Sequence, residues 1–394
     1  MPDEGVPGRS AAGRGGLAPP AERAAKLADL VHEHAPATQE GRRPAAPVMR
    51  AFADEGLLRI LAPRDYGGEE ATGLAFMELV EAVSRADGSA GWTVMTLNEE
   101  IEISAGYVPA ETMRSVCTSS PAVIVAGSGA ALGRVQPTDG GWRLSGRWPF
   151  VTGGPAADEI VVGATVEGPR PRSLCFCLVP ASDVEILDTW DTVGLRGTGS
   201  HDIAIHDVFV PAERAGVVAS GRDTLPDATL FRLPPALRFP FPKVGVATGI
   251  ARTAIATFTE LAEGKKARVS RTLLRDRPDA QLAVARAEAL VGSGWAFAVD
   301  MVETIWELAE RGERVPPAVH ARTRLACTHA VASCVSAVET ICTAAGTTAN
   351  LTGSALHRHL ADVRAVPQHV MVGGYNELNA GRVLLGLPAD DPLF

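Results

Sequence analysis

The stretch Gly140-Gly141-Trp142-Arg143-Leu144-Ser145-Gly146-Arg147-Trp148-Pro149-Phe150-Val151-Thr152-Gly153-Gly154 decides how this chain folds. Its large apolar residues, at positions 142, 144, 148 and 150, alternate with arginine and serine, which is the period of a half-buried β-strand. The dipeptide Asp139-Gly140 just before it is typical of a β-hairpin. Pro149 withholds one backbone donor, and the glycines after Thr152 allow backbone conformations that other residues avoid. The stretch therefore predicts a strand that leaves its sheet near residue 150.

The sequence around this stretch divides the chain into segments of different period. Residues 121–215 keep the period of two and predict a small antiparallel β domain. Residues 20–120 have helical spacing. Residues 241–394 predict three long helices, each with one apolar stripe, and a fourth that begins near Leu356, as in a four-helix bundle. Pro367 and Gly373-Gly374 interrupt the fourth helix. Residues 216–240 are a Pro-rich connection, and residues 1–19 are expected to be a disordered tail.

Composition excludes several classes of protein. Of the 394 residues, 46% are hydrophobic and 21% charged, which is typical of a globular protein. A net charge of −9 argues against a general nucleic-acid binder. No run of about 18 apolar residues predicts a membrane span, and the N-terminus lacks the apolar core of a signal peptide. We therefore expect a cytoplasmic protein. The six cysteines and nine histidines show no metal-ligand spacing, so no metal site is predicted.

Further motifs occur in a fixed order along the chain. They are Pro63–Gly68, Arg85–Trp92, Gly140–Gly154, Gly194–Ser200 and Val210-Pro211. In their order and spacing over residues 20–394 the chain resembles the acyl-CoA dehydrogenase superfamily, and more closely its branch of two-component, reduced-flavin-dependent monooxygenases. The resemblance implies an acyl-CoA dehydrogenase-like fold: an N-terminal α-helical domain, a central β-barrel-like domain and a C-terminal four-helix bundle.

The resemblance also implies which residues meet a flavin. Phe150, Val151 and Thr152 would line the isoalloxazine, with Thr152 near N5 and O4, and Gly153 would allow close approach of the backbone. Ser128 belongs to the segment that replaces the Thr-Glu-Pro typical of dehydrogenases and is a further candidate for cofactor binding.

Three other sites have two interpretations each. Thr198 and Ser200 lie in a turn that the family places near cofactor or substrate, although a plain β-turn explains them equally well. Arg271, with Arg268 and Arg275 nearby, would contact the flavin phosphate, or form a solvated surface. Asn98 would lie over the flavin, or be a buried helix residue.

The residue near the reacting position separates dehydrogenase from oxygenase. Dehydrogenases of this superfamily keep a carboxylate eight residues after an Arg-Asp pair, and the equivalent count from Asp362 reaches Val370. Glu377, and Glu260 earlier in the bundle, are the alternatives for a base. His369, beside Val370, matches the histidine of the monooxygenase branch and is the candidate general base for a phenol or amine proton.

The resemblance thus implies an enzyme that receives reduced FMN or FAD from a separate flavin reductase. The absence of a nicotinamide fingerprint in the sequence agrees with reduction by a partner. Through a C4a-hydroperoxide the enzyme would use molecular oxygen to hydroxylate a small aromatic, polyketide or amino-sugar-like substrate. A homotetramer is implied by the family. The alternatives are an acyl-CoA dehydrogenase-like desaturase that acts on a thioester with bound FAD, and a flavin-binding scaffold without catalysis.

Overall fold

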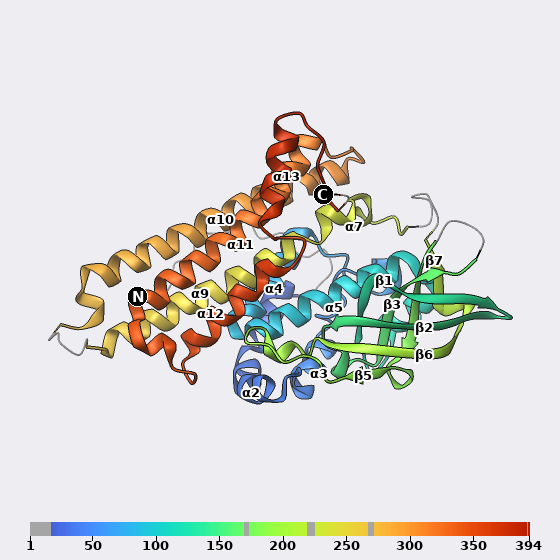
Figure 1. The fold of residues 1–394 in the computed structure, drawn as a ribbon, viewed down its shortest axis with the longest axis horizontal. Coiled ribbons are helices and arrows are strands. Elements are labelled where there is room, and N and C mark those ends of the chain that lie inside the picture. The colour runs from blue at the N-terminus through green and yellow to red at the C-terminus, as the bar shows by residue number, and fades with distance from the viewer. Residues whose placement is uncertain (1–16, 169–172, 219–224, 267–271, 392) are drawn as a thin grey trace.

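The structure, a computed structural model, describes residues 17–168, 173–218, 225–266, 272–391 and 393–394. A twisted β-sheet lies at one end of the molecule and a long helical bundle at the other, with helices α4 and α5 between them (Figure 1). The predicted order of N-terminal helices, central sheet and C-terminal helices is confirmed. Residues 1–16 of the predicted tail lie outside the described residues.

Side-chain caps begin the two central helices of the N-terminal part. The Thr72 hydroxyl accepts a hydrogen bond from Ala75 N at 3.2 Å, and Asp87 Oδ1 accepts one from Ala90 N at 2.9 Å. Most of the helix that begins after Asp87 is buried, which is expected of a helix enclosed by other elements on all sides. The N-terminal helices are α1 Pro20–Ala25, α2 Ala28–Gly41, α3 Ala46–Asp54, α4 Gly73–Ala86, α5 Gly88–Tyr107 and α6 Ala110–Thr118.

The β-hairpin predicted at Asp139-Gly140 is present, with Thr138 paired to Gly141 and φ +76° at Gly140. Trp148 is completely buried, and its indole Nε1 donates to Gly163 O at 2.8 Å. A Cβ on Gly133 would lie 2.2 Å from the Trp148 ring, so the indole occupies space that any other residue at 133 would fill. The strands are β1 Val125–Thr138, β2 Gly141–Val151, β3 Glu159–Val166, β4 Leu174–Pro180, β5 Glu185–Leu187, β6 His201–Pro211 and β7 Ala215–Val217.

The prediction of a purely antiparallel domain is wrong in one pairing. Among the described residues the strand order is β5-β6-β2-β1-β3-β4-β7, and β1 and β3 are parallel. The chain leaves β2 at Val151, passes across the start of β1 in residues 152–158, and enters β3 in the same direction as β1. Asp158 N donates to Ile124 O at 2.8 Å, and Asp158 Oδ2 accepts from Ile124 N at 2.9 Å, which holds this crossing segment in place.

The sheet ends later than residue 215, because β7 pairs with β4 as far as Val217. Its edge strands β5 and β7 do not pair with each other within the described part of the chain, so the central sheet stays open. The Pro-rich connection, of which residues 219–224 are not described, contains two short helices, α7 Thr229–Arg232 and α8 Pro235–Arg238.

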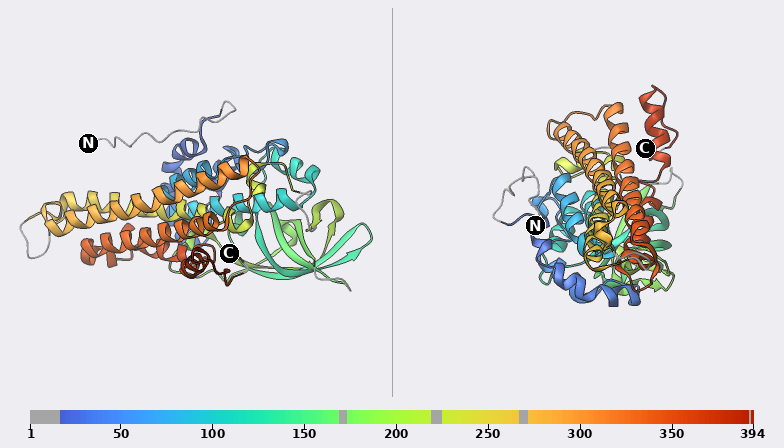
Figure 2. Two further views of the ribbon diagram at one scale, coloured as in Figure 1. Left: turned by 90° about the horizontal axis from the view of Figure 1, so that it is seen from above. Right: turned by 90° about the vertical axis from the view of Figure 1, so that its left-hand side faces the viewer.

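The C-terminal helices pack side by side, as the second view shows from above (Figure 2). The stripe predicted on the first of them is confirmed, since Val244, Ala247, Ala251, Ile255 and Phe258 are buried. Two of these helices are long and apolar enough to cross a membrane by length and composition, but here they pack against each other and the rest of the bundle. The helices are α9 Phe241–Gly264, α10 Pro278–Glu310, α11 Pro317–Ala345, α12 Ala355–Ala365 and α13 Tyr375–Leu384, with a short 3₁₀ turn, η9 Val366–Gln368, after α12.

Candidate active site

The crossing segment after β2 places Thr152 where the sheet meets α5. Thr152 is buried, and the next residue, Gly153, has φ +74° and donates its N–H to Thr198 O at 2.9 Å. A Cβ at Gly153 would lie 2.9 Å from Leu97 Cδ1 of α5 in a backbone conformation that only glycine adopts without strain. Gly153 therefore lets the sheet, the loop around Thr198 and α5 come together.

Phe150 breaks the alternation of β2. The pairing of β2 with β6 shifts between Trp148 and Val151, Phe150 takes φ +61°, and its side chain is 68% exposed. Its ring meets the Trp190 ring edge to face, with centroids 6.1 Å apart. A positive φ at an aromatic residue is strained, and such strain concentrates at functional sites. Phe150 thus presents a flat aromatic surface outside the sheet.

Val151 does not line this surface. Its side chain is completely buried in the core of the sheet, so Val151 would meet a flavin ring through its backbone alone. The reason is the same shift in pairing, which turns residue 150 outward and residue 151 inward.

The loop Gly194–Ser200 is tied to both sets of helices. Leu195 N donates to Asp362 Oδ1 of α12 at 2.7 Å, and Gly197 N donates to Ser89 Oγ of α5 at 3.2 Å. Thr189 and Trp190 precede the loop, and His201 follows it. The backbone N–H groups of Thr189 and Trp190 both donate hydrogen bonds to His201 Nδ1 at 3.2 Å. The loop therefore has a defined conformation of its own and is not a plain β-turn.

Three buried hydroxyls connect Thr152 to this loop. Thr152 Oγ1 lies 2.8 Å from Ser200 Oγ, which lies 2.7 Å from Thr198 Oγ1, and Thr198 Oγ1 donates to Leu195 O at 2.9 Å. The structure thus brings together Thr152, Thr198 and Ser200, which the sequence pointed to in two separate motifs 46 residues or more apart.

His369 follows η9 and contacts α5. Its imidazole meets the Trp92 ring edge to face at 5.8 Å, and its Nδ1 accepts a hydrogen bond from Met371 N at 3.2 Å. Burial, together with the cations Lys243 and Arg324, lowers the pKa of His369 to about 3. The ring is therefore neutral near pH 7 with its proton on Nε2, so it presents a donor and no free lone pair.

A buried charged cluster on α5, which no sequence motif indicated, lies close enough to this histidine for its Lys243 to lower the pKa of His369. Lys243 of α9 pairs with Glu99, and Arg238 lies 3.1 Å from Glu102. Burial and the neighbouring Glu99 raise the pKa of Glu100 to about 8, and its Oε2 has no partner among the described residues. Glutamates at 99, 100 and 102 point to different faces of one helix. In an otherwise apolar helix, this pattern could have indicated a buried charged cluster from the sequence.

Several other predicted residues do not join the site. Asn98 is fully buried, and its amide binds the backbone of Ile60, Leu57 and Val94, which favours the interpretation as a buried helix residue over a position above the flavin. Ser128 lies on β1, partly exposed, at the point where its pairing with β3 shifts.

The candidate arginines and bases lie elsewhere. Arg268 and Arg271 fall outside the described residues, and Arg275 lies 3.9 Å from Asp276 with its side chain more than half exposed. The two alternative bases, Glu260 and Glu377, are both exposed.

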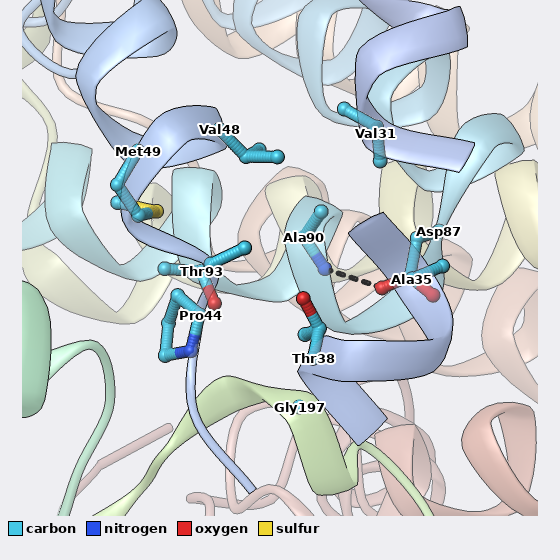
Figure 3. Close-up of a pocket in the computed structure, with 11 residues that line it drawn as sticks. Val31, Ala35, Thr38, Pro44, Val48, Met49, Asp87, Ala90, Thr93 and Gly197 are labelled. Carbon is cyan, nitrogen blue, oxygen red and sulfur yellow. Dashed lines mark hydrogen bonds between the residues drawn. The ribbon is translucent and has the colours of Figure 1, made fainter. Parts of the chain in front are cut away.

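A small pocket between α2, α3, α5 and the loop Gly194–Ser200 is not the site. Figure 3 shows its lining, with Asp87 bound to the backbone of Ala90, and Thr38, Thr93 and Gly197 around it. Its volume of about 10 Å³ is no larger than the space for one water molecule, so it cannot hold an aromatic compound.

Comparison with known proteins identifies the relatives of this chain. Residues 22–105 match the family model of the acyl-CoA dehydrogenase N-terminal domain, and residues 243–373 match that of the acyl-CoA dehydrogenase C-terminal domain. Indole-3-acetate monooxygenase of Pseudomonas putida is 35% identical over 341 residues, covering 86% of each chain. The oxygenase component of FADH2-dependent resorcinol hydroxylase from Rhizobium sp. is 33% identical over 68% of this chain and 69% of its own. The crystal structure of 3-HSA hydroxylase from Rhodococcus sp. RHA1 superposes with a TM-score of 0.85 at 27% identity, covering 96% of this chain and 99% of the other.

Proposed function

Because this chain belongs to the acyl-CoA dehydrogenase family, within its flavin-dependent monooxygenases, we propose that it is the oxygenase component of a two-component hydroxylase. A separate reductase supplies reduced FMN or FAD, and the enzyme uses molecular oxygen. One oxygen atom enters the substrate and the other leaves as water, while the reduced flavin supplies two electrons and is released oxidised.

The residues at the end of β2 fit a flavin. Phe150 and Trp190 offer aromatic surface on which a planar ring system can pack. Two residues after Phe150 along the chain, Thr152 carries a hydroxyl that can bond to a polar edge of such a ring. A flavin bound there supplies the electrons and activates the oxygen. Everything else depends on how the chain's own groups orient the ligands and place a proton.

The single observation that carries this proposal is the way α5 joins two sets of residues. The Trp92 ring contacts the His369 imidazole, and Gly153 packs against the side chains of Leu97 and Thr93. His369 and Gly153, the residue after Thr152, therefore both lie against residues 92–97 of α5. We propose that His369 Nε2–H binds an oxygen of the reacting ligands, and that Trp92 and the Met371 backbone set the orientation of the imidazole.

The dehydrogenase alternative lacks its base at the expected positions. Val370 occupies the position of the carboxylate, and the side chains of Glu377 and Glu260 are exposed to solvent. Neither glutamate could therefore accept an α-proton from a thioester bound at the site. This arrangement supports hydroxylation over desaturation.

We propose a small aromatic substrate. The relatives are named for action on indole-3-acetate and on resorcinol, both aromatic. Trp92 beside His369 offers an aromatic surface suited to such a ring.

The test is a single turnover. Protein is mixed anaerobically with reduced FMN or reduced FAD and then with oxygen, in the presence of a panel of indoles and phenols, and hydroxylated product is measured against hydrogen peroxide. We expect product from at least one aromatic compound, with peroxide falling in proportion. Peroxide alone with every compound, together with electron transfer from an acyl thioester to bound FAD, would overturn the proposal in favour of desaturation.

We further propose a homotetramer in the cytoplasm, in which Arg271 contributes to the flavin phosphate site. Helix α10 supports an assembly, because only 28% of an 18-residue apolar stretch of this helix is buried in the single chain. On α13, Leu378 is 68% exposed. Apolar surface of this kind on a bundle favours packing against another copy.

A further inference from the structure

The hydrogen bonds that run from Thr152 through Ser200 and Thr198 to the Leu195 carbonyl can point in only one direction, because the last acceptor has no proton. The Leu195 carbonyl carries no hydrogen, so its 2.9 Å contact with Thr198 Oγ1 requires the Thr198 proton. Each hydroxyl has one proton to give. Thr198 must therefore accept at its 2.7 Å contact with Ser200, and the Ser200 proton points to Thr198.

The same reasoning applies one step further. With the Ser200 proton used, the 2.8 Å contact between Ser200 and Thr152 requires the proton of Thr152. All three hydroxyls are at most 3% exposed, so water does not readily replace any of these bonds. The Thr152 oxygen is left with lone pairs only: it can accept a hydrogen bond from a ligand but cannot donate one.

We propose that this ordered chain selects the reduced form of the flavin, with Ser200 and Thr198 as the positioning residues that determine the selectivity. Reduced flavin carries a hydrogen on N5, so N5–H can donate a hydrogen bond to the Thr152 oxygen. Oxidised flavin has only a lone pair on N5, which would face the lone pairs of Thr152. This inference rests on the proposed function, because it takes the flavin as the ligand and Thr152 as the partner of N5.

Preference for the reduced form suits an oxygenase that exchanges its flavin with a reductase. A Thr152 oxygen that can only accept would hold reduced flavin in the site and would favour release of the oxidised form. A dehydrogenase that keeps its flavin through both oxidation states has no such need.

The experiment measures the dissociation constants of oxidised and anaerobically reduced FMN and FAD for each variant, without turnover. Ser200→Ala removes the acceptor of the Thr152 proton, which can then point outward to N5 of oxidised flavin. We expect oxidised flavin to bind about tenfold more tightly to Ser200→Ala, with reduced flavin changed much less. A tenfold fall in the ratio of the two constants corresponds to a shift of about 30 mV in the two-electron potential of bound flavin.

Two further variants separate the direction of the chain from simple packing. Thr198→Val removes the contact with Leu195 O, frees the Ser200 proton to point back to Thr152, and should change the ratio in the same direction. Thr198→Ser keeps the hydroxyl and should retain the ratio of the wild-type protein. Thr152→Val removes the partner of N5, and should weaken reduced flavin about fivefold.

The outcomes distinguish this inference from the proposed function. If neither form of flavin binds the wild-type protein, both fail. If flavin binds and Thr152→Val changes neither affinity, or if Ser200→Ala and Thr198→Val both keep the wild-type ratio, then the ordered chain does not select the flavin, and the monooxygenase assignment stands without it.

Discussion

The His369 side chain is held in a form that differs from the one a general base needs. Its Nδ1 already accepts the Met371 N–H, so the neutral ring carries its proton on Nε2. To act as a base at Nε2 the ring would have to exchange its tautomer and give up the Met371 bond. The histidine that the sequence identifies is therefore better suited to donate a hydrogen bond than to remove a proton.

Two substitutions at His369 distinguish these roles. His369→Ala should slow hydroxylation in a single turnover by about 10²-fold or more, as loss of a positioned proton-transfer or donor group does. His369→Gln should recover part of that rate, because its amide N–H donates but cannot act as a base. An equal loss in both variants would favour the base. Glu377→Gln, at an exposed position, is the control and should be silent.

The pH dependence of the same reaction follows from the pKa of His369. Since that pKa is lowered to about 3, the imidazole stays neutral from pH 5 to 8, and the rate should show no change from its titration in this range. Rates measured in wild-type and His369→Ala protein across this range provide the test. A change in rate near pH 6.5 that is present in the wild-type protein and absent in His369→Ala would contradict this prediction.

Glu100 should make the stability of the fold depend on pH. Its pKa in the folded protein, about 8, lies above that of an unfolded glutamate, so its favourable contribution is complete below about pH 4.5 and is lost as pH rises through 8. Glu100→Gln cannot ionise and should unfold at a higher temperature than wild type at pH 8.5, with little difference at pH 5. Thermal unfolding at both pH values, with Glu377→Gln as the exposed control, tests this. A Glu100→Gln protein that is less stable at pH 8.5 would mean that the carboxylate is held charged by Lys243.

At the scale of elements, the loop Gly194–Ser200 connects the sheet to both sets of helices. Its carbonyl at Leu195 ends the hydroxyl chain, and the N–H of the same residue is held by Asp362 of α12. The position of a helix in the bundle is thus transmitted to the hydroxyls at the end of β2. A change at α12 should alter the flavin site without touching any residue that faces the ligand.

Asp362→Ala tests this connection. The variant leaves the buried Leu195 N–H without its acceptor, which should lower the free energy of unfolding by about 1 to 3 kcal/mol. Asp362→Asn keeps an acceptor oxygen and also relieves repulsion from Asp87, so it should lose less. Denaturant unfolding gives both values, and an Asp362→Asn protein as unstable as Asp362→Ala would show that the charge, not the hydrogen bond, holds the loop.

At the scale of the whole molecule, the bundle end has apolar surface that one chain does not cover. Helix α13 projects from the bundle (Figure 1). Leu378 on this helix and Leu385 just after it are both more than two-thirds exposed. Together with the partly exposed α10, this surface is what an assembly through the bundle needs.

The assembly is tested by sedimentation. We expect the wild-type protein to sediment as a tetramer at micromolar concentration, and Leu378→Glu to shift it toward smaller species, because burying an unpaired charge is costly. Leu132→Glu, at an exposed leucine of the sheet, is the matched control and should leave the tetramer intact. A wild-type protein that sediments as a monomer would remove the proposal.

The sequence by itself determined what depends on neighbours a few residues apart. The hairpin at Asp139-Gly140, the strand around Trp148 and the apolar stripe of α9 follow from local turn chemistry and from periods of two and of three to four residues. The order of motifs was enough to identify the family.

Only the tertiary structure decided what depends on contacts between distant segments. The parallel pairing of β1 with β3 depends on the contacts of Asp158 with Ile124, and the outward turn of Phe150 depends on the shifted pairing with β6. The direction of the hydroxyl chain follows from a carbonyl 43 residues beyond Thr152, and the buried carboxyl of Glu100 from helices that surround α5. No local pattern encodes these features, because a hydrogen-bond direction, a strained φ and a shifted pKa are set by whichever groups the fold brings alongside.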